Sequence, residues 1–442
     1  MVNLARLWVM GSRVRPHQQF WWGLLPVLAL GAWRFFQGGW SGLNCLALGR
    51  GGEQPTICVD PYWLNQWLKN YAGGFTKRGL IGEVLRHVLP GDLDLLAVTV
   101  AALLLLLLCY ALLYWLIGRL VARSRLAAVL LTCLLLLSPF GKSLAETALD
   151  PLQVCLILAA SVLFTPVASR WRDGWLLVVY VLCSLIYEGC ALLLLPYVLL
   201  LQRPGMGRWL PVGLAIGLLL VFQRSDAPEI GEAASAALRA VNPWTGQSLR
   251  YQEGGGIAAS VGFLFNVKQE FSRYLQDPPR DTLARVARSL GVVLAYLLVM
   301  LTAMGPGRSP CRRVLVQRWL IFVPVALPFV LITHDWFRYG VILLTLALLL
   351  TAAEAGAGRP GLLPAAAWSL TRNERWALLP LSAMVVIGPY GEDVRKFLPH
   401  NYFHASLLML AFAAVIFWLS LGSAAPVAAA EVALPQQSDQ AD

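Results

Sequence analysis

Six side chains able to accept or donate a proton stand in the turns and loops between the long apolar runs of this sequence. They are Asp60, Glu146, Asp150, Glu188, His334 and Asp335. Carboxylates and imidazoles are the groups that most often take the proton of an attacking hydroxyl. Ionisable residues are also costly at membrane depth, so each is a candidate functional residue in a chain this hydrophobic. We therefore take these six as candidate catalytic residues.

Three of the acids also admit a structural explanation. Glu146 and Asp150 are four positions apart in GKSLAETALDPLQ, so a helical turn would place them on one face. Asp150 precedes Pro151, however, which is typical of an ordinary helix start. Asp60 precedes Pro61 in CVDPYWLNQW and has the same N-cap pattern.

The remaining acids lie beside predicted helix ends. Glu188 separates two apolar runs in SLIYEGCALLLLP, with no basic residue nearby in the sequence. Such a carboxylate needs a partner from elsewhere in the fold or must stay protonated; alternatively, it is a hydrogen-bonding anchor at a helix break. In ITHDWFRYG, Asp335 and Arg338 are spaced for an intrahelical ion pair. Interfacial anchoring would explain Arg338 and Tyr339, but not His334 or Asp335.

Three basic residues are candidates for holding a phosphate or another anionic substrate group. Lys77 and Arg78 lie beside the flexible pair Gly73-Gly74 in YAGGFTKRGLIG, and Arg338 follows His334 and Asp335. Charge-assisted hydrogen bonds from such cations to phosphate are strong. The alternative is contact with lipid headgroups.

Two of the eight cysteines differ from the rest in their surroundings. Most cysteines lie inside apolar runs, but Cys45 and Cys58 fall in the first long polar loop. An oxidising compartment on that side would allow them to form a disulfide. The sequence does not show how close they lie, so pairing and free thiols both stay open.

The composition indicates which elements must position these residues. The chain has 442 residues, of which 58% are hydrophobic and 13% charged, whereas a soluble domain has about 25% charged residues. We predict an all-α fold, a polytopic transmembrane helical bundle of about twelve spans, with a range of roughly ten to thirteen. The predicted spans are 20–36, 93–118, 124–139, 152–168, 174–187, 189–202, 207–222, 285–304, 315–333, 336–353, 376–389 and 402–421.

The distribution of basic residues predicts the orientation. With a cytoplasmic N-terminus, arginines gather in the inside connections 119–125, 170–172, 203–208, 308–313 and 359–375. The formal net charge of +11 then reflects topology and anionic lipid rather than nucleic acid. We expect a multi-pass protein of a bacterial inner (plasma) membrane. Fusing 174–202 into one helix would invert everything downstream.

The predicted organisation places two large loops outside. Residues 1–19 form a cytoplasmic N-terminus, and 20–222 form an N-terminal membrane region that includes the outer loop 37–92. Helical spacing of Trp67 and Leu68, and of Leu80 to Val88, predicts two amphipathic helices on the membrane surface in that loop. The remaining segments are the second outer loop 223–284, the C-terminal membrane region 285–421 and a disordered cytoplasmic tail 422–442.

Several reaction classes lack their motifs. The sequence contains no HExxH, paired CxxC, Walker A or GxSxG pattern, so zinc protease, redox, ATPase and α/β-hydrolase functions have no support. No predicted span carries a chain of acids of the kind proton-coupled transporters often use.

A first outer loop of surface helices with an Asp, followed by many spans with acidic outer turns, resembles the polytopic glycosyltransferases of the GT-C class. The resemblance implies transfer of a sugar from a polyprenyl-phosphate-linked donor to an acceptor on the non-cytoplasmic face. It implies Asp60 or Glu146 as the base, with Asp150 in the second acidic turn. Lys77, Arg78 or Arg338 would hold the phosphate, and His334 and Asp335 would orient the acceptor or a divalent metal ion. The first loop lacks the paired acidic motif common in that class.

Two alternatives remain open. One is a polysaccharide polymerase or ligase, in which the outer-loop residues Arg250, Arg273 and Arg280 would be essential. The other is a non-enzymatic transporter or flippase, in which polar residues would line a path through the membrane. The sequence does not indicate the sugar, the acceptor or the oligomeric state.

Overall fold

The computed structural model describes residues 44–46, 57–59, 66–75, 78–88, 151–164, 171–202, 206–223, 310–332 and 336–356, together with isolated positions elsewhere. In this part of the chain no helix was found that has both the length and the apolar composition needed to cross a bilayer. Predicted spans 20–36, 124–139 and 376–389 lie outside the described residues, as do both chain ends.

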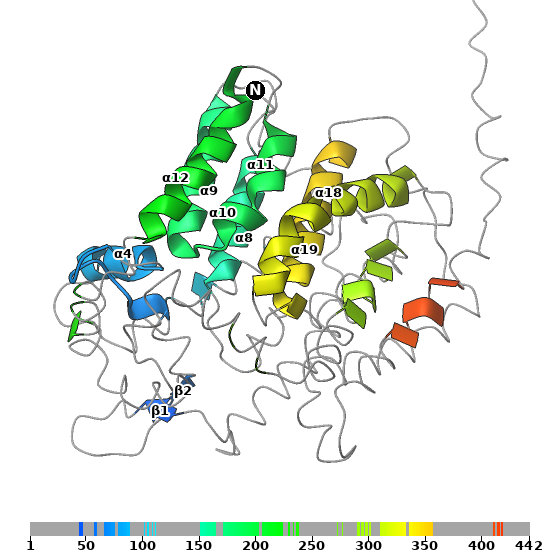
Figure 1. Ribbon diagram of the computed structural model, residues 1–442. Coiled ribbons are helices and arrows are strands. Elements are labelled where there is room, and N and C mark those ends of the chain that lie inside the picture. The colour runs from blue at the N-terminus through cyan, green and yellow to red at the C-terminus, as the bar shows by residue number, and fades with distance from the viewer. Residues whose placement is uncertain are drawn as a thin grey trace, which may run out of the picture.

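The described part of the chain is mainly helical, as the sequence predicts (Figure 1). A short antiparallel pair, β1 (Asn44–Leu46) and β2 (Ile57–Val59), is the exception. The helices are α4 (Leu80–Val88), α8 (Leu152–Ser161), η1 (Val162–Phe164), α9 (Trp171–Ile186), α10 (Cys190–Leu193), α11 (Leu195–Leu201), η2 (Met206–Trp209), α12 (Leu210–Gln223), α18 (Pro310–Ile332) and α19 (Trp336–Gly356).

The chain reverses direction between α9 and α10, at Tyr187, Glu188 and Gly189. The hydroxyl of Tyr180 donates to the carbonyl of Ala191 over 2.5 Å. In one straight helix these two residues would lie about 16 Å apart along the axis, so α10 must fold back along α9. The region 174–202 therefore forms two antiparallel segments, which settles an ambiguity that the sequence left open. Pro196 accounts for the further break between α10 and α11, because its ring cannot continue the helical hydrogen bonds.

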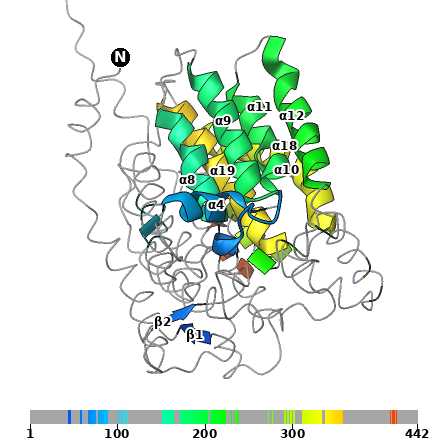
Figure 2. The same ribbon diagram turned by 90° about the vertical axis from the view of Figure 1, so that its left-hand side faces the viewer.

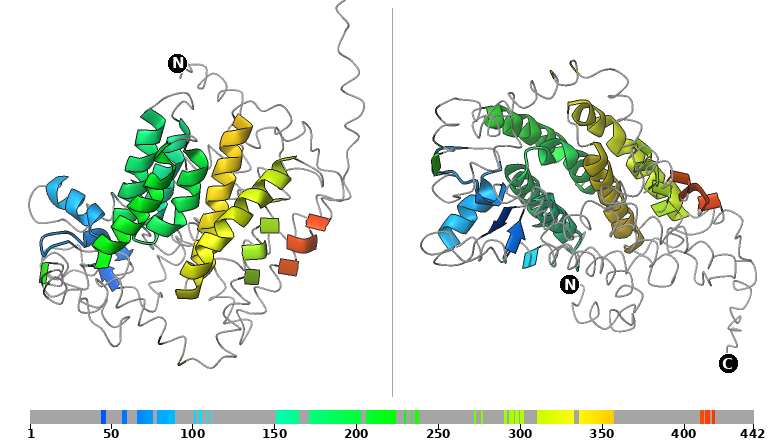
Figure 3. Two further views of the ribbon diagram at one scale, coloured as in Figure 1. Left: turned by 45° about the horizontal axis from the view of Figure 1, so that its top comes forward. Right: turned by 90° about the horizontal axis from the view of Figure 1, so that it is seen from below.

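Two groups of helices pack into one bundle. The helices α8 to α12 form the first group, and α18 packs along α19 to form the second; contacts of α10 with α18 and of α11 with α19 join them. Figure 3 shows both groups from two directions. Tyr180, Tyr197 and Phe322 are fully buried between the helices. The Tyr197 hydroxyl donates to the carbonyl of Ala159 over 2.8 Å, which satisfies its polar group inside this packing.

The bundle has two different ends. Because α9 is 16 residues long, its first residue, Trp171, lies about 24 Å from the reversal at Glu188. We call the end with Trp171, Gln202 and Trp209 the tryptophan end, where Gln202 Nε2 donates to the carbonyl of Gly207 over 2.7 Å. We call the end with the reversal the polar end.

Part of the first long loop is docked against the polar end. Residues 66–75 and α4 lie beside the ends of the helices (Figure 2), and α4 contacts α9. Trp67 and Leu68 are fully buried in protein, so they do not face a membrane surface as the amphipathic pattern predicts. In α4 the exposed hydrophobic residues are Val84 and Val88.

Gly82 sets the close approach of α4 to the preceding segment. A Cβ atom at this position would lie 1.9 Å from the carbonyl oxygen of Lys69 and 2.8 Å from the carbonyl carbon of Leu68. Contacts that short do not occur between real atoms, so the helix can pack here only with glycine. This packing fixes α4 relative to the segment that leads to Arg78.

Candidate functional site

A buried ion pair joins the docked loop to the reversal between α9 and α10. Arg78 donates from Nε to Glu188 Oε2 over 2.7 Å and from its NH2 group to Glu188 Oε1 over 2.6 Å. The NH1 group donates to Gln66 Oε1 over 3.2 Å. Both charged side chains are shielded, with 14% of Arg78 and 8% of Glu188 exposed. This two-point geometry is the strongest form of a carboxylate–guanidinium contact.

The backbone before Arg78 forms a turn, and Arg78 itself has a left-handed conformation from which its side chain reaches Glu188. Asn70 Oδ1 accepts the amide hydrogen of Ala72 over 2.9 Å, and the amide of Gly74 donates to the carbonyl of Tyr71 over 3.0 Å. These contacts form a turn in which Gly74 has a φ of 109°. Arg78 itself has a φ of 62°, a left-handed conformation that costs a non-glycine residue about 1–3 kcal/mol. The ion pair offsets this strain.

Tyr187 contacts the ion pair, and Tyr339 contacts Tyr187. The guanidinium carbon of Arg78 lies 4.3 Å from the centre of the Tyr187 ring, a cation–π contact that also shields the charge from water. The hydroxyls of Tyr187 and Tyr339 form a hydrogen bond, and both residues are buried. The site thus gathers residues from the docked loop, the reversal and the first turns of α19.

The arrangement determines what each charged group can do. Both oxygens of Glu188 accept hydrogen bonds from Arg78. Glu188 is therefore placed to orient Arg78. Arg78 in turn places a planar guanidinium, whose charge Glu188 compensates, at the polar end of the bundle.

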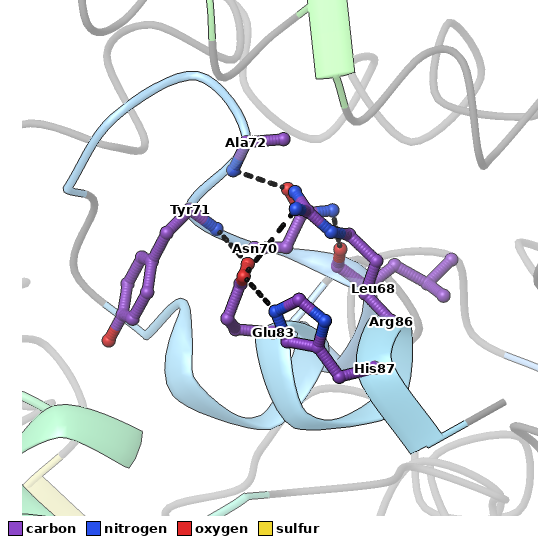
Figure 4. A network of polar contacts seen from close by, with 7 residues as sticks. All are labelled: Leu68, Asn70, Tyr71, Ala72, Glu83, Arg86 and His87. Atoms are coloured by element: carbon purple, nitrogen blue, oxygen red, sulfur yellow. Dashed lines mark hydrogen bonds and ion pairs between the residues drawn. The ribbon is translucent and has the colours of Figure 1, made fainter.

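A second polar network lies within the docked loop, centred on Glu83 (Figure 4). Glu83 Oε2 accepts the amide hydrogen of Tyr71 over 2.8 Å, and Oε1 lies 3.0 Å from His87 Nε2 and 3.7 Å from an NH2 nitrogen of Arg86. His87 and Arg86 are largely exposed. This network connects α4 to the turn that precedes Arg78.

An aromatic stack connects the loop to α12. The ring centres of Tyr71 and Phe75 are 5.4 Å apart, and those of Phe75 and Phe222 are 6.1 Å apart. Burial, and secondarily the negative charge of Glu83, raises the pKa of Tyr71 to about 12. Since Phe222 lies near the C-terminal end of α12, that end also belongs to the polar end of the bundle.

The structure brings two predicted site residues together, Arg78 and Glu188, although they are 110 positions apart in sequence. Arg338 lies in the first turn of α19, one position before Tyr339, but its side chain is outside the described part. The remaining predicted catalytic and phosphate-binding residues lie outside the described residues: Asp60, Lys77, Glu146, Asp150, His334 and Asp335.

Sequence reasoning missed the role of three residues. Gln66 gave no signal, because an isolated glutamine in a polar loop is ordinary. Tyr187 directly precedes Glu188, and its neighbour could have suggested a polar cluster. Tyr339 was expected to anchor at the membrane interface, but it is only 3% exposed and bonds to Tyr187.

Two other predicted features can be placed in part. Cys45 stands directly opposite Cys58 in the register of β1 and β2, and the described residues say nothing further of their side chains. Over the described ranges, no group of three or more His, Cys, Asp or Glu side chains could hold a metal ion. His334 and Asp335, the predicted metal-orienting pair, are outside those ranges.

Comparison of the chain with protein-family models, with curated proteins and with solved structures found no match.

Proposed function

We propose that this chain is an integral membrane glycosyltransferase that uses a polyprenyl-phosphate-linked sugar at the polar end of its bundle. The observation that carries the proposal is the convergence of Arg78, Glu188 and Tyr339 at the end where residues 66–75 and α4 dock. A guanidinium oriented by a carboxylate at one end of an apolar bundle lies where the phosphate of a polyprenyl lipid would meet the protein, because that phosphate stays at the membrane surface while its chain lies among the helices.

The exposed apolar residues support a membrane location. Large hydrophobic side chains on the outer surface of the helices include Val178, Leu210, Ile216, Leu220, Leu320 and Ile321. The helix α12 carries no charged residue along its length, which suits a lipid environment better than water.

The tryptophan end supports an orientation. Trp171 is 86% exposed and Trp209 is 78% exposed, and tryptophan is enriched where a membrane span meets water. Arg172, in the first turn of α9, and Arg208, in η2, stand at this same end, which favours the cytoplasmic side. The polar end, with Glu188, then faces the non-cytoplasmic compartment.

The chemistry requires a phosphate leaving group, a base and charge compensation. The bond between the sugar's anomeric carbon and the phosphate oxygen breaks, and a bond forms to the acceptor oxygen. Arg78, oriented by Glu188, would stabilise the negative charge on the released polyprenyl phosphate. Asp60 or Glu146 would accept the proton of the acceptor hydroxyl, and His334 and Asp335 would orient the acceptor.

The test is release of polyprenyl phosphate from a lipid-linked sugar by the purified protein in nanodiscs. We expect turnover by the native chain and at least a 100-fold loss in Asp60→Asn or Glu146→Gln, since a general base contributes about 10²–10⁴-fold. Glu83→Gln is the matched control, because Glu83 is a partly buried acid of the same docked loop outside the proposed site.

Two results would count against the proposal. Full turnover in both Asp60→Asn and Glu146→Gln would remove the assigned bases. Movement of the intact lipid-linked sugar across a proteoliposome membrane, with no polyprenyl phosphate released, would indicate a flippase instead.

A further inference from the structure

We propose that Cys45 and Cys58 form a disulfide bond that closes the hairpin of β1 and β2 directly before Asp60. The assignment of this bond to the non-cytoplasmic compartment rests on the proposed function, because that function places loop 37–92 on the non-cytoplasmic side. The bond itself rests on the strand register, which is independent of any reaction.

The register of the two strands shows that Cys45 and Cys58 lie close together, which the sequence alone could not show. In the antiparallel pair, Asn44 stands opposite Val59, Cys45 opposite Cys58, and Leu46 opposite Ile57. The Cα atoms of directly opposed residues lie about 4.5–5.5 Å apart. Disulfides need a Cα separation of about 4.4–6.8 Å. A shift of one position in either direction would put a Leu, Ile, Asn or Val opposite a cysteine instead.

The hairpin itself is short. Each strand has three residues, and an isolated two-stranded hairpin is marginally stable in water. The connecting segment contains Gly49, Gly51 and Gly52, which raise the conformational entropy lost on closing the loop. A covalent link between the strands lowers the entropy of the open chain and so favours the closed form.

The other cysteines whose side chains are described are poorly placed to compete. Cys155, Cys183 and Cys190 carry reduced thiols that are buried among α8, α9 and α10. Thiol–disulfide exchange requires access of an attacking thiolate. An incoming oxidant would therefore meet these buried thiols less readily than thiols in a polar loop.

The oxidation is a thiol–disulfide exchange with a dithiol–disulfide oxidoreductase of the non-cytoplasmic compartment. One cysteine thiolate attacks the disulfide of that partner and gives a mixed disulfide. The second thiolate then attacks the chain's own sulfur and releases the reduced dithiol partner. The chain loses two electrons and two protons, and the partner gains them.

The disulfide would help to position Asp60, the proposed catalytic base that follows it in the chain. Cys58 is two residues before Asp60, and Pro61 follows. Fixing Cys58 against Cys45 restricts the positions that Asp60, two residues further along the chain, can reach. Cys45 and Cys58 are therefore positioning residues in this account, with no contact to the substrate.

The sequence offers a direct measurement, because Arg50 lies between the two cysteines. The full-length protein is isolated from membranes after thiols are blocked with N-ethylmaleimide, and it is then digested with trypsin without reductant. We expect peptides 35–50 and 51–69 to appear as one linked species, two hydrogen atoms lighter than their sum. Reduction should separate them.

Single cysteine variants test whether Cys45 and Cys58 are each other's partners. Cys45→Ser should leave Cys58 modified by N-ethylmaleimide, and Cys58→Ser should do the same for Cys45. Cys155→Ser is the matched control and should leave the linked species unchanged. Recovery of both native peptides carrying N-ethylmaleimide would overturn the proposal, as would linkage of either cysteine to a different partner.

The outcome is separable from that of the proposed function. Linked peptides without release of polyprenyl phosphate would support the disulfide and contradict the glycosyltransferase. Turnover by a protein with both thiols free would contradict the disulfide alone.

Discussion

Glu188 and Glu83 are both acids paired with arginine at the docked loop, yet their surroundings differ. Glu188 joins two distant parts of the chain, and both its oxygens accept from Arg78 at 2.6 and 2.7 Å. Glu83 contacts Arg86 at 3.7 Å and His87 at 3.0 Å, three and four residues away on its own helix. The first pair is shielded, whereas Arg86 is 41% exposed and His87 is 67% exposed.

The difference indicates which network holds the tertiary structure. An exposed pair between neighbours on one helix contributes about 0.3–0.5 kcal/mol, because water screens it and the helix forms without it. Removing one partner of a buried pair costs far more, since the other charge remains buried without compensation. Glu188 and Arg78 should therefore determine whether the loop docks against the helices. Glu83 should affect only the stability of contacts within the loop.

The largest expected effect is that of Glu188→Ala. It leaves the Arg78 guanidinium buried beside Tyr187 without its carboxylate, and we expect a loss of about 3–5 kcal/mol. Thermal unfolding of the purified protein in one detergent measures this against Glu83→Ala, for which we expect a loss of about 1–2 kcal/mol, because that change removes an exposed ion pair and the acceptor of the Tyr71 amide. Equal shifts in the two variants would remove the distinction between the two networks.

The next effect tests the close packing of α4 against residues 68 and 69, in the same docked loop as Arg78 and Glu83. Gly82→Ala places a methyl group against the Lys69 carbonyl, at a site where a Cβ would approach to 1.9 Å. We expect a loss of about 1–3 kcal/mol from this overpacking. The matched control is Gly213→Ala in α12, where a Cβ would meet nothing within 4 Å. The control should be neutral or slightly stabilising, and a loss in both variants would point to a general cost of removing helical glycines.

A smaller effect is expected from the tyrosine pair behind Arg78. Tyr339→Phe removes one hydroxyl from the buried contact with Tyr187, and we expect a loss of about 1 kcal/mol. In the background of Tyr187→Phe the same substitution should cost less, because its partner hydroxyl is already absent. Unchanged costs in the two backgrounds would show that the hydroxyls act separately.

The smallest effect concerns Glu83 and the titration of Tyr71. Burial and the Glu83 charge raise the pKa of Tyr71 to about 12 from the ordinary value of 10.0. A raised pKa stabilises the fold below pH 10, and this contribution is lost as the pH rises from 10 to about 12. Glu83→Gln should lower the Tyr71 pKa modestly, because desolvation remains. Ultraviolet absorbance titration, with Tyr71→Phe as the reference, measures the shift; an unchanged pKa would contradict the Glu83 contribution.

Helix positions were the most predictable part of the fold. Apolar runs predicted segments that coincide with α8, α9, α12, α18 and α19, because burial of uninterrupted apolar surface leaves few alternatives. The helix Leu80–Val88 also follows its amphipathic spacing. The burial of Trp67 and Leu68 within protein was not predictable, since periodicity shows that one face is apolar and not what covers it.

For the candidate site, the sequence predicted the need for a partner of Glu188 but not its identity. No basic residue lies near Glu188 in sequence, so only the fold could supply Arg78. The left-handed backbone at Arg78 has no signal either, because that conformation usually belongs to glycine. The docking of the loop depends on contacts between distant segments, which a single sequence does not encode in any local pattern.

The most direct test of the account is a double-mutant cycle on the pair that joins loop and bundle. The unfolding of Arg78→Gln, Glu188→Gln and the double variant is compared with that of the native chain under identical conditions. We expect the double variant to be more stable than the sum of the single losses implies, with a coupling of about 2–3 kcal/mol. Strictly additive losses would mean that Arg78 and Glu188 do not hold the loop to the bundle.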